Sequence, residues 1–194
     1  MNRTDRKRPK GGKVLLLAAF IVAAAILGTL MLKKYLERRQ AVPRPVHTQP
    51  AGKVSVSLFF ASPDNGGLVR ESREIEACNA DLSRCVQATL EELANGPMGD
   101  LVPTIPANST FRSATIQGDT VVVDLDKGLV NSLPKGSSAE MTAVYSMVNT
   151  ITYNFPTVKR VKFLLEGHAI TTLGGHLDLE KPLEPDFRME SPQG

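Results

Sequence analysis

The residues of this chain that could do chemistry are two cysteines, two histidines and a few acidic side chains. Cys78 and Cys85 are seven positions apart. In one continuous helix their Cα atoms would lie about 10.5 Å apart, beyond the ~7 Å that a disulfide allows. Cys78 must therefore precede a helix that contains Cys85. We predict a structural disulfide between them. The first alternative is two free buried thiols. The second is a metal site or a redox pair, which is disfavoured because the sequence has no C-x-x-C motif.

His168 and His176 lie on either side of Gly174 and Gly175, with Asp178 close behind. The two histidines and Asp178 could converge on a metal ion or flank a nucleophile. The Thr and Gly residues around them are typical of exposed turns, however, and no zinc-binding histidine spacing accompanies them. We therefore interpret both histidines as surface residues, and we predict no catalytic residue, metal ligand or cofactor-binding residue.

Asp124 and Asp126 are two positions apart, so both would lie on one face of an extended strand and could form a carboxylate pair for acid–base catalysis. Val121, Val123 and Leu125 alternate with them on the opposite face. We therefore expect the two acids to mark the solvent side of the strand. The sequence also lacks the phosphate-binding loop, the dinucleotide-binding turn and the nucleophile elbow of common enzymes. Enzymatic activity is not predicted.

Five extended segments are predicted, at residues 54–60, 68–75, 111–116, 120–125 and 161–165. Apolar residues alternate with others in the first and the last, and the third and fourth are rich in residues that favour strands. The second of these is short and rich in charge, which is typical of an edge strand or an extended connection. The third and fourth are expected to form a hairpin, because Gly118 between them can adopt the positive φ of a tight turn.

Two helices are predicted from apolar residues at helical spacing. The first follows Asp81, which is placed to cap it, and ends before Gly96. The second begins with a capping box in which Ser137 and Glu140 would satisfy each other's backbone amides, and it ends before Pro156. This order of elements predicts an α+β fold, with two helices packed on one face of one small mixed β-sheet.

Residues 14–32 carry no charge and are flanked by Lys and Arg on both sides. A helix of this length would reach about 28 Å, close to the thickness of the hydrocarbon core of a bilayer. We predict a transmembrane signal anchor. A cleaved secretory signal is the alternative, since small residues at 23–25 could accept a peptidase. The basic residues on both sides leave the orientation open, although a cysteine pair favours an oxidising compartment for the body.

The two parts of the chain have opposite charge. Residues 1–52 hold 11 Lys/Arg against 2 Asp/Glu, whereas residues 53–194 hold 12 against 18. The basic part would lie beside anionic lipid, and the acidic part offers no positive surface to neutralise phosphates, so nucleic-acid binding is not predicted. The predicted segments are a cytoplasmic basic tail at 1–13, the anchor at 14–32, a Pro-rich stalk at 33–52, a globular domain at 53–187 and a disordered end at 188–194.

A series of short motifs appears in a fixed order along the globular domain: residues 92–97 (ELANGP), Ile105-Pro106, residues 118–125 (GDTVVVDL), Gly136-Ser137, Glu140, residues 161–167 (VKFLLEG) and residues 183–186 (LEPD). This series resembles the GerMN domain of sporulation and spore germination proteins over residues 54–187. The chain differs from the spore protein in having one copy of the domain, no lipid-attachment cysteine, and the Cys78/Cys85 pair.

The resemblance implies an extracytoplasmic, membrane-attached α+β domain, similar to the ring-building motifs of envelope assemblies, with no catalytic residue or cofactor to carry over. We therefore expect a non-catalytic scaffold on the outer side of the cytoplasmic membrane, which contacts membrane lipid through its anchor. Its domain would dock on an envelope protein or on copies of itself. The alternatives are a cell-wall glycan or peptide binding module and, less favoured, an envelope hydrolase or its regulator. No small-molecule substrate is evident.

Overall fold

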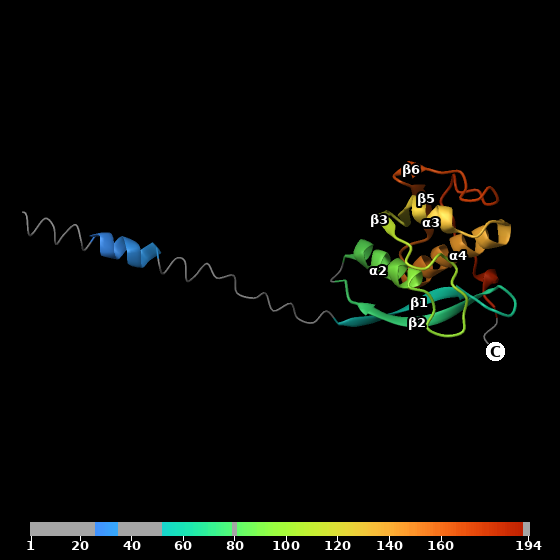
Figure 1. Cartoon of the computed structure of the whole chain (residues 1–194), viewed down its shortest axis with the longest axis horizontal. Helices are drawn as coiled ribbons and strands as arrows, with labels where there is room; N and C mark the ends of the chain where they lie inside the picture. The colour runs from blue at the N-terminus through green and yellow to red at the C-terminus, as the bar shows by residue number, and fades with distance from the viewer. Residues whose placement is uncertain (1–25, 35–51, 79–80, 192–194) are drawn as a thin grey trace, which may run out of the picture. The chain divides into compact units, whose positions relative to one another are not determined.

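The computed structural model describes residues 26–34, 52–78 and 81–191. The chain divides into two compact units, Met1–Gln49 and Pro50–Gly194. In the first unit, residues 26–34 are helical (Figure 1). The basic tail, the first twelve residues of the predicted anchor and most of the predicted stalk lie outside the described residues. Among the residues that are described, no helix has the length and apolar content needed to cross a bilayer.

The second unit begins with an antiparallel hairpin of β1 (Lys53–Ala61) and β2 (Leu68–Glu76). The side chains of β1 are buried from Leu58 onward, as expected for an apolar strand that ends inside the domain. Most side chains of β2 are exposed or half-buried. The prediction of an edge strand at residues 68–75 is therefore confirmed.

Helix α2 (Leu82–Ala94) begins where the sequence predicts. The Asp81 carboxylate accepts a hydrogen bond from the Arg84 N–H at 3.2 Å, so the predicted cap is confirmed. After Asn95, Gly96 has a φ of 81°, in the left-handed region that glycine adopts without strain.

The remaining strands form a four-stranded sheet in the order β3-β4-β5-β6. Their bounds are β3 (Phe111–Gln117), β4 (Thr120–Leu125), β5 (Arg160–Leu165) and β6 (His168–Ala169). β3 and β4 form the predicted hairpin, and Gly118 between them has a φ of 64°. β5 runs parallel to β4. A parallel pair needs a crossover, which here consists of α3 (Lys127–Ser132), absent from the sequence prediction, and α4 (Ser137–Asn154).

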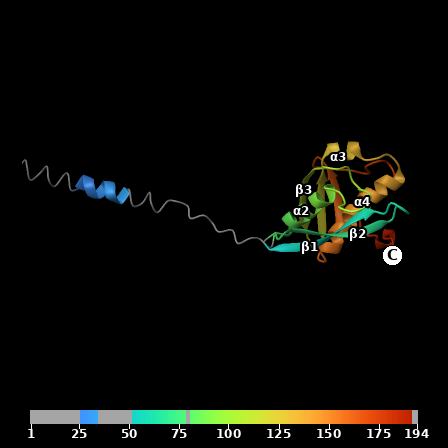
Figure 2. The same cartoon turned by 60° about the horizontal axis from the view of Figure 1, so that its bottom comes forward.

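The α+β class and a small mixed sheet with two helices on one face are as predicted, whereas the separate sheet formed by the β1–β2 hairpin is not predicted. The strands form two sheets, and α2 and α4 lie between the β1–β2 hairpin and the four-stranded sheet (Figures 1 and 2). Both faces of this helical layer are therefore covered. One continuous core joins the layers; it includes Leu58, Leu90, Val123, Met147 and Phe163, each at most 1% exposed.

The outer edge of β1 is closed by side chains of α4 and not by another strand. The Asn154 amide accepts the Ser57 N–H at 2.8 Å and donates to the Ser57 carbonyl at 2.7 Å. One helical turn earlier, the Thr150 hydroxyl accepts the Phe59 N–H, and Ser146 donates to the Phe59 carbonyl at 2.6 Å. Because these groups satisfy the edge of β1, the hairpin does not need to join the larger sheet.

The C-terminal segment has a defined conformation up to Ser191, whereas the sequence predicts disorder at 188–194. Residues Phe187–Met189 form a short 3₁₀ helix. The buried Asn149 amide holds both backbone groups of Asp186 at 3.0 Å. The Ser191 N–H donates to the Leu68 carbonyl at 2.8 Å. Residues 192–194 lie outside the described residues.

Candidate interaction surface

The three residues considered for a metal or nucleophile site are exposed and do not form a site. His168 belongs to the two-residue strand β6, and His176 and Asp178 lie in the following loop; all three are exposed. Within the described residues, no group of three or more His, Cys, Asp or Glu side chains is close enough to hold a metal ion. The histidines are surface residues, as the sequence predicts.

Asp124 in β4 and Asp126 just after the strand have structural roles, and the expectation that both face solvent is wrong for Asp124. This residue is 9% exposed, and its carboxylate accepts the Gly167 N–H at 2.8 Å and pairs with Arg112 at 3.2 Å. Asp126 caps α3 by accepting the Gly128 N–H at 2.6 Å. The Asp124 carboxylate therefore binds the turn that follows β5, and the Asp126 carboxylate binds the turn that follows β4.

Glu140 has a role that local sequence reasoning missed. The helix begins at Ser137 with Gly136 as its N-cap, and no side chain completes the predicted capping box. Instead the Glu140 carboxylate is 3% exposed and points into the loop after β6. Its two oxygens accept hydrogen bonds of 2.6–2.9 Å from four donors: the Thr172 hydroxyl and the N–H groups of Leu173, Gly174 and His176.

These donors determine the ionisation of Glu140. Burial alone would raise the pKa of this carboxyl, but the four hydrogen bonds favour the charged form and bring the pKa below its ordinary value. A Cβ on Gly174 would lie 3.0 Å from Glu140 Oε2, so a larger residue there would have to displace the carboxylate by a few tenths of an ångström. A cavity of about 420 Å³ borders Glu140, Lys135 and His176. Both oxygens of the Glu140 carboxylate already accept hydrogen bonds from the loop after β6.

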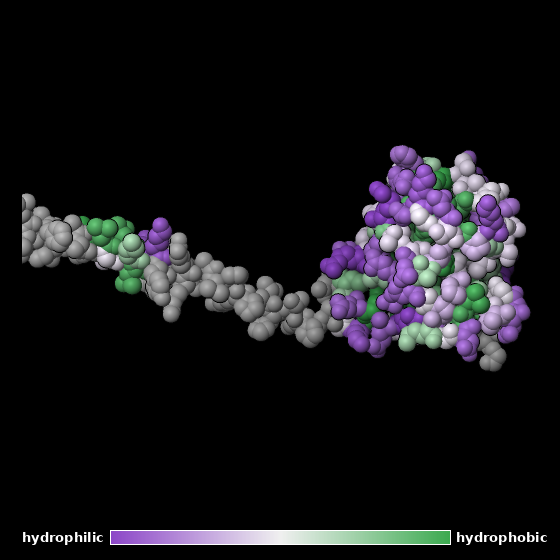
Figure 3. Space-filling view, in the orientation of Figure 1, coloured by the Kyte–Doolittle hydropathy of each residue, from purple (hydrophilic) through white to green (hydrophobic). Residues whose placement is uncertain are grey.

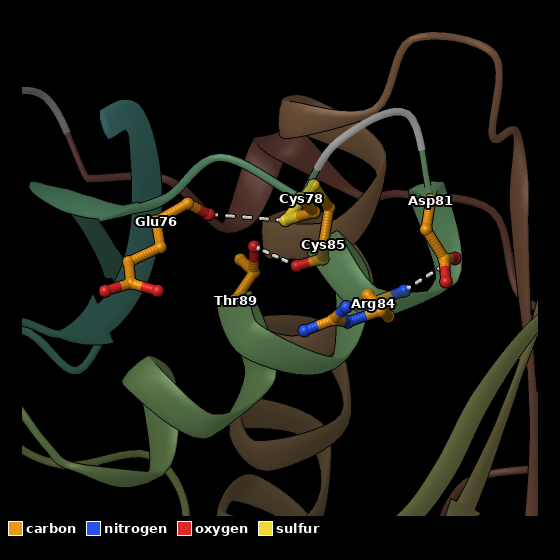
Figure 4. Close-up of a disulfide and its surroundings, with 6 residues drawn as sticks. All are labelled: Glu76, Cys78, Asp81, Arg84, Cys85 and Thr89. Atoms are coloured by element: carbon orange, nitrogen blue, oxygen red, sulfur yellow. Dashed lines mark hydrogen bonds between the residues drawn. A yellow bond between two sulfur atoms is a disulfide. The ribbon is translucent and has the colours of Figure 1, made fainter. Parts of the chain in front are cut away.

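The disulfide joins Cys78 to Cys85 with Cα atoms 5.3 Å apart. Cys78 precedes α2 and Cys85 lies in its first turns, as the sequence requires (Figure 4). Asp81 caps the same turn, and Thr89 donates to the Cys85 carbonyl one turn later at 2.8 Å. The bond therefore ties the segment that leaves β2 to the start of α2.

An aromatic cluster lies where the C-terminal segment crosses the hairpin. The rings of Phe59, Tyr153 and Phe187 have centroids 5.7–6.3 Å apart. Phe59 is fully buried, whereas Tyr153 and Phe187 are each 43% exposed. The Arg70 guanidinium lies 4.9 Å from the centre of the Tyr153 ring and pairs with Glu190. Phe59 therefore contacts both exposed rings from the buried side, and Arg70 contacts the Tyr153 ring.

An open groove of about 600 Å³ adjoins this cluster. It is lined by Thr152, Tyr153, Pro156, Val158, Lys159, Glu184, Pro185 and Phe187. One basic and one acidic side chain flank rings and prolines, which is the composition expected where a protein segment docks. On the face drawn in Figure 3, hydrophilic residues dominate and hydrophobic ones are scattered. We call the Tyr153–Phe187 rings and their groove the aromatic groove.

The aromatic groove is not predicted from the sequence. Tyr153 falls near the end of the second predicted helix, which stops before Pro156, and nothing in the local sequence marks it as part of a surface site. Phe187 was assigned to the end of the domain and given no role. The available signal was the polar spacing of Asn149 and Asn154 on α4, because buried amides need backbone partners and can fix a returning segment.

Residues 57–171 match the family described as Germane, sporulation and spore germination. The curated proteins contain no match to the chain. Among solved structures, the first GerMN domain of the sporulation protein GerM from Bacillus subtilis is 19% identical, with a TM-score of 0.50 over 69% of this chain and 96% of that one.

The tandem GerMN domains of the same GerM protein are 18% identical, with a TM-score of 0.54 over 69% of this chain. This chain covers 46% of that longer protein. The two likenesses show that the second unit has the α+β fold of GerMN domains. Because the family match spans more than half of the sequence, the chain belongs to the Germane family of sporulation and spore germination domains.

Proposed function

We propose that this protein is a non-catalytic interaction domain, anchored in the cytoplasmic membrane by one N-terminal helix and facing the extracytoplasmic side, where it binds an envelope protein. The family supports a role linked to sporulation, germination or envelope assembly. The uncharged run at residues 14–32 supports the anchor, and residues 26–34 within and after it are helical. The disulfide supports the oxidising side of the membrane.

The aromatic groove is the observation that carries the binding role. Exposed aromatic rings contribute most to protein interfaces when they are already fixed, because little conformational entropy is then lost on binding. Tyr153 is fixed by Phe59 and Arg70, and Phe187 by the Asn149–Asp186 contact next to it. The acids and histidines that could support catalysis either stabilise the fold or lie separately on the surface.

The binding role is tested with Phe187→Ala in the full-length chain. Proteins crosslinked to the chain in its native membrane are recovered and quantified. We expect about a tenfold loss of the crosslinked partner, as for a central aromatic contact. Met98→Ala is the matched control, since Met98 is 81% exposed and lies outside the groove. Equal recovery for the two variants, with both folded, would contradict the proposal.

The anchoring is tested separately with protease added to spheroplasts. The domain should be digested in intact spheroplasts, and the protein should stay with the membrane fraction after a carbonate wash. Protection until lysis would place the domain in the cytoplasm and refute this part of the proposal.

A cell-wall glycan or peptide binding module is the second candidate. Two exposed aromatic rings beside a groove can also stack on a sugar, and this observation favours the wall-binding function. Binding of the full-length chain to purified wall material separates the candidates. Retention that Phe187→Ala abolishes would support the wall-binding function over a protein partner. An envelope hydrolase or its regulator would instead require His168, His176 or Asp178. Because we propose a non-catalytic function, we expect cells with all three residues replaced by alanine to behave like cells with the native chain.

A further inference from the structure

The outer edge of β2 has backbone groups that the fold does not use. Odd-numbered residues of β1 direct their N–H and C=O groups to α4 and Val102, so even-numbered residues of β1 bond to β2. In the register that pairs Leu58 with Glu71, the even-numbered residues of β2 must therefore point outward. These outward residues include Arg70, Ser72 and Glu74.

Only one end of this edge is covered. The Leu68 carbonyl accepts the Ser191 N–H. In residues 52–78 and 81–191, no other backbone hydrogen bond reaches the outward groups of Arg70, Ser72 or Glu74. Ser72 is exposed, and the Glu74 side chain is 65% exposed. A strand edge of this kind is a template for another strand.

The sequence of β2 is complementary to itself in the antiparallel direction. With Ser72 opposite Ser72 of a second copy, Arg70 faces Glu74. Glu71 and Arg73 also face each other, but they already pair at 2.6 Å within each chain and are 19% and 11% exposed. The charge complementarity therefore depends on Arg70 and Glu74. Opposite charges at directly facing positions stabilise an antiparallel pair. We propose that two copies of this chain associate through their β2 edges, as a two-fold antiparallel pair centred on Ser72, and form a four-stranded sheet in the order β1-β2-β2-β1.

Two neighbouring registers keep the same hydrogen-bonding geometry but have poorer charge pairing. Centring on Glu71 places this side chain against its own copy, and centring on Arg73 does the same for the arginine. Like charges at facing positions destabilise a sheet. Ser72 is an outward-pointing residue, so a two-fold axis there gives a hydrogen-bonded pair, and Arg70 with Glu74 gives the next one on each side.

The contact is short, because Ser191 already covers Leu68 and limits pairing to Arg70 through Glu74. Five residues from each copy bury less than the roughly 1,600 Å² of a standard stable interface. We therefore expect a weak, reversible dimer that forms when copies are concentrated, as on a shared membrane. It goes beyond the proposed function. Arg70 takes part in both, because its guanidinium also contacts Tyr153 and pairs with Glu190. Ser72 and Glu74 lie outside the aromatic groove, so variants at these two positions test the pairing independently of the proposed function.

Ser72→Cys in the full-length chain tests the pairing in phospholipid vesicles under mild oxidation. A hydrogen-bonded antiparallel pair holds its Cα atoms about 5.5 Å apart, within reach of a disulfide. We expect a dimer linked through position 72 to form about ten times faster than with Ser138→Cys, an exposed serine on α4. Peptide mapping distinguishes this bond from exchange with Cys78 or Cys85.

Charge reversal supplies the second measurement, by co-purification of two differently tagged full-length chains. Glu74→Arg would face Arg70 of the other copy and should abolish both co-purification and the rapid crosslink. Glu76→Arg makes the same change on the same strand, outside the paired segment, and should preserve both. Crosslinking of Ser72→Cys no faster than Ser138→Cys, or to a different polypeptide, would overturn the self-pairing. An equal effect of the two reversals would also overturn it.

Discussion

The two edges of the β1–β2 hairpin are treated in opposite ways by the same fold. The β1 edge is bonded at Ser57 and Phe59 by side chains of α4, and at Ala61 by Val102. The β2 edge is bonded only at Leu68 within the described residues. Buried backbone groups need partners, whereas exposed ones can bond to water. The difference indicates that the first edge stabilises the domain and that the second is free for association.

The largest expected effect comes from opening the closed edge. Asn154→Ala leaves both backbone groups of Ser57 without their partner, and each such loss costs about 1–3 kcal/mol. We expect a loss of about 3 kcal/mol in the free energy of unfolding, measured by urea denaturation. Asn131→Ala on α3 is the control, because that side chain is exposed. If both variants have the same stability, the β1 edge is not held by α4.

The second effect concerns the segment that connects β2 to α2. The disulfide closes an eight-residue loop, for which the chain-entropy estimate is about 2.5 kcal/mol. Cys78→Ser combined with Cys85→Ser should reduce the free energy of unfolding by about that amount. Reductant should destabilise the native chain and leave the double variant unaffected. A native chain that does not respond to full reduction would show that the bond does not stabilise this end of β2.

The β1 edge is bonded by neutral side chains of α4, whereas the loop after β6 is bonded by the charged Glu140 of the same helix. The two contacts should therefore differ in their dependence on pH. The folded pKa of Glu140 is below the ordinary value of about 4.3. The stabilisation by Glu140 is therefore fully present above the ordinary pKa and is lost as the pH falls through the folded pKa. Stability of the native chain should begin to fall below about pH 5 and should keep falling until the pH is below the folded pKa.

Glu140→Gln should cost about 2 kcal/mol near neutral pH, since an amide offers one oxygen to four donors. The variant should also have a shallower loss of stability in acid. Glu180→Gln, at an exposed position, should retain the native pH profile. Asn154→Ala should shift the whole profile down without changing its slope. A native slope in Glu140→Gln would mean that another carboxyl causes the acid sensitivity.

Sequence patterns predicted the elements whose causes are local. Alternation identified β1 and β5, Asp81 marked the start of α2, and Gly118 marked the hairpin of β3 and β4. The cysteine spacing placed Cys78 before the helix, because helix geometry alone excludes the alternative. Each of these inferences depends on residues within about one or two turns of one another.

The features that were missed depend on distant partners. Glu140 fits a capping box locally, but donors 32–36 residues later in the chain bind its carboxylate instead. Ser146, Thr150 and Asn154 recur every fourth residue along α4, a polar stripe that the apolar pattern concealed. Such a stripe is the signal that a helix closes a strand edge, and it explains why the strands form two sheets. Neither partner can be located without the fold.

The smallest expected effect is at the open edge, and a matched pair of serines measures it. Ser146 donates to the buried Phe59 carbonyl and shares a hydrogen bond with Thr104, so Ser146→Ala should cost about 1–2 kcal/mol. Ser72 shares its hydroxyl only with the exposed Ser55, so Ser72→Ala should change the free energy of unfolding by less than about 0.5 kcal/mol. Dilute protein is required, because association would add to the apparent stability. Equal losses for the two serines would mean that the fold depends on the Ser72 side chain as strongly as on Ser146, and the contrast between the two edges would then be wrong at this position.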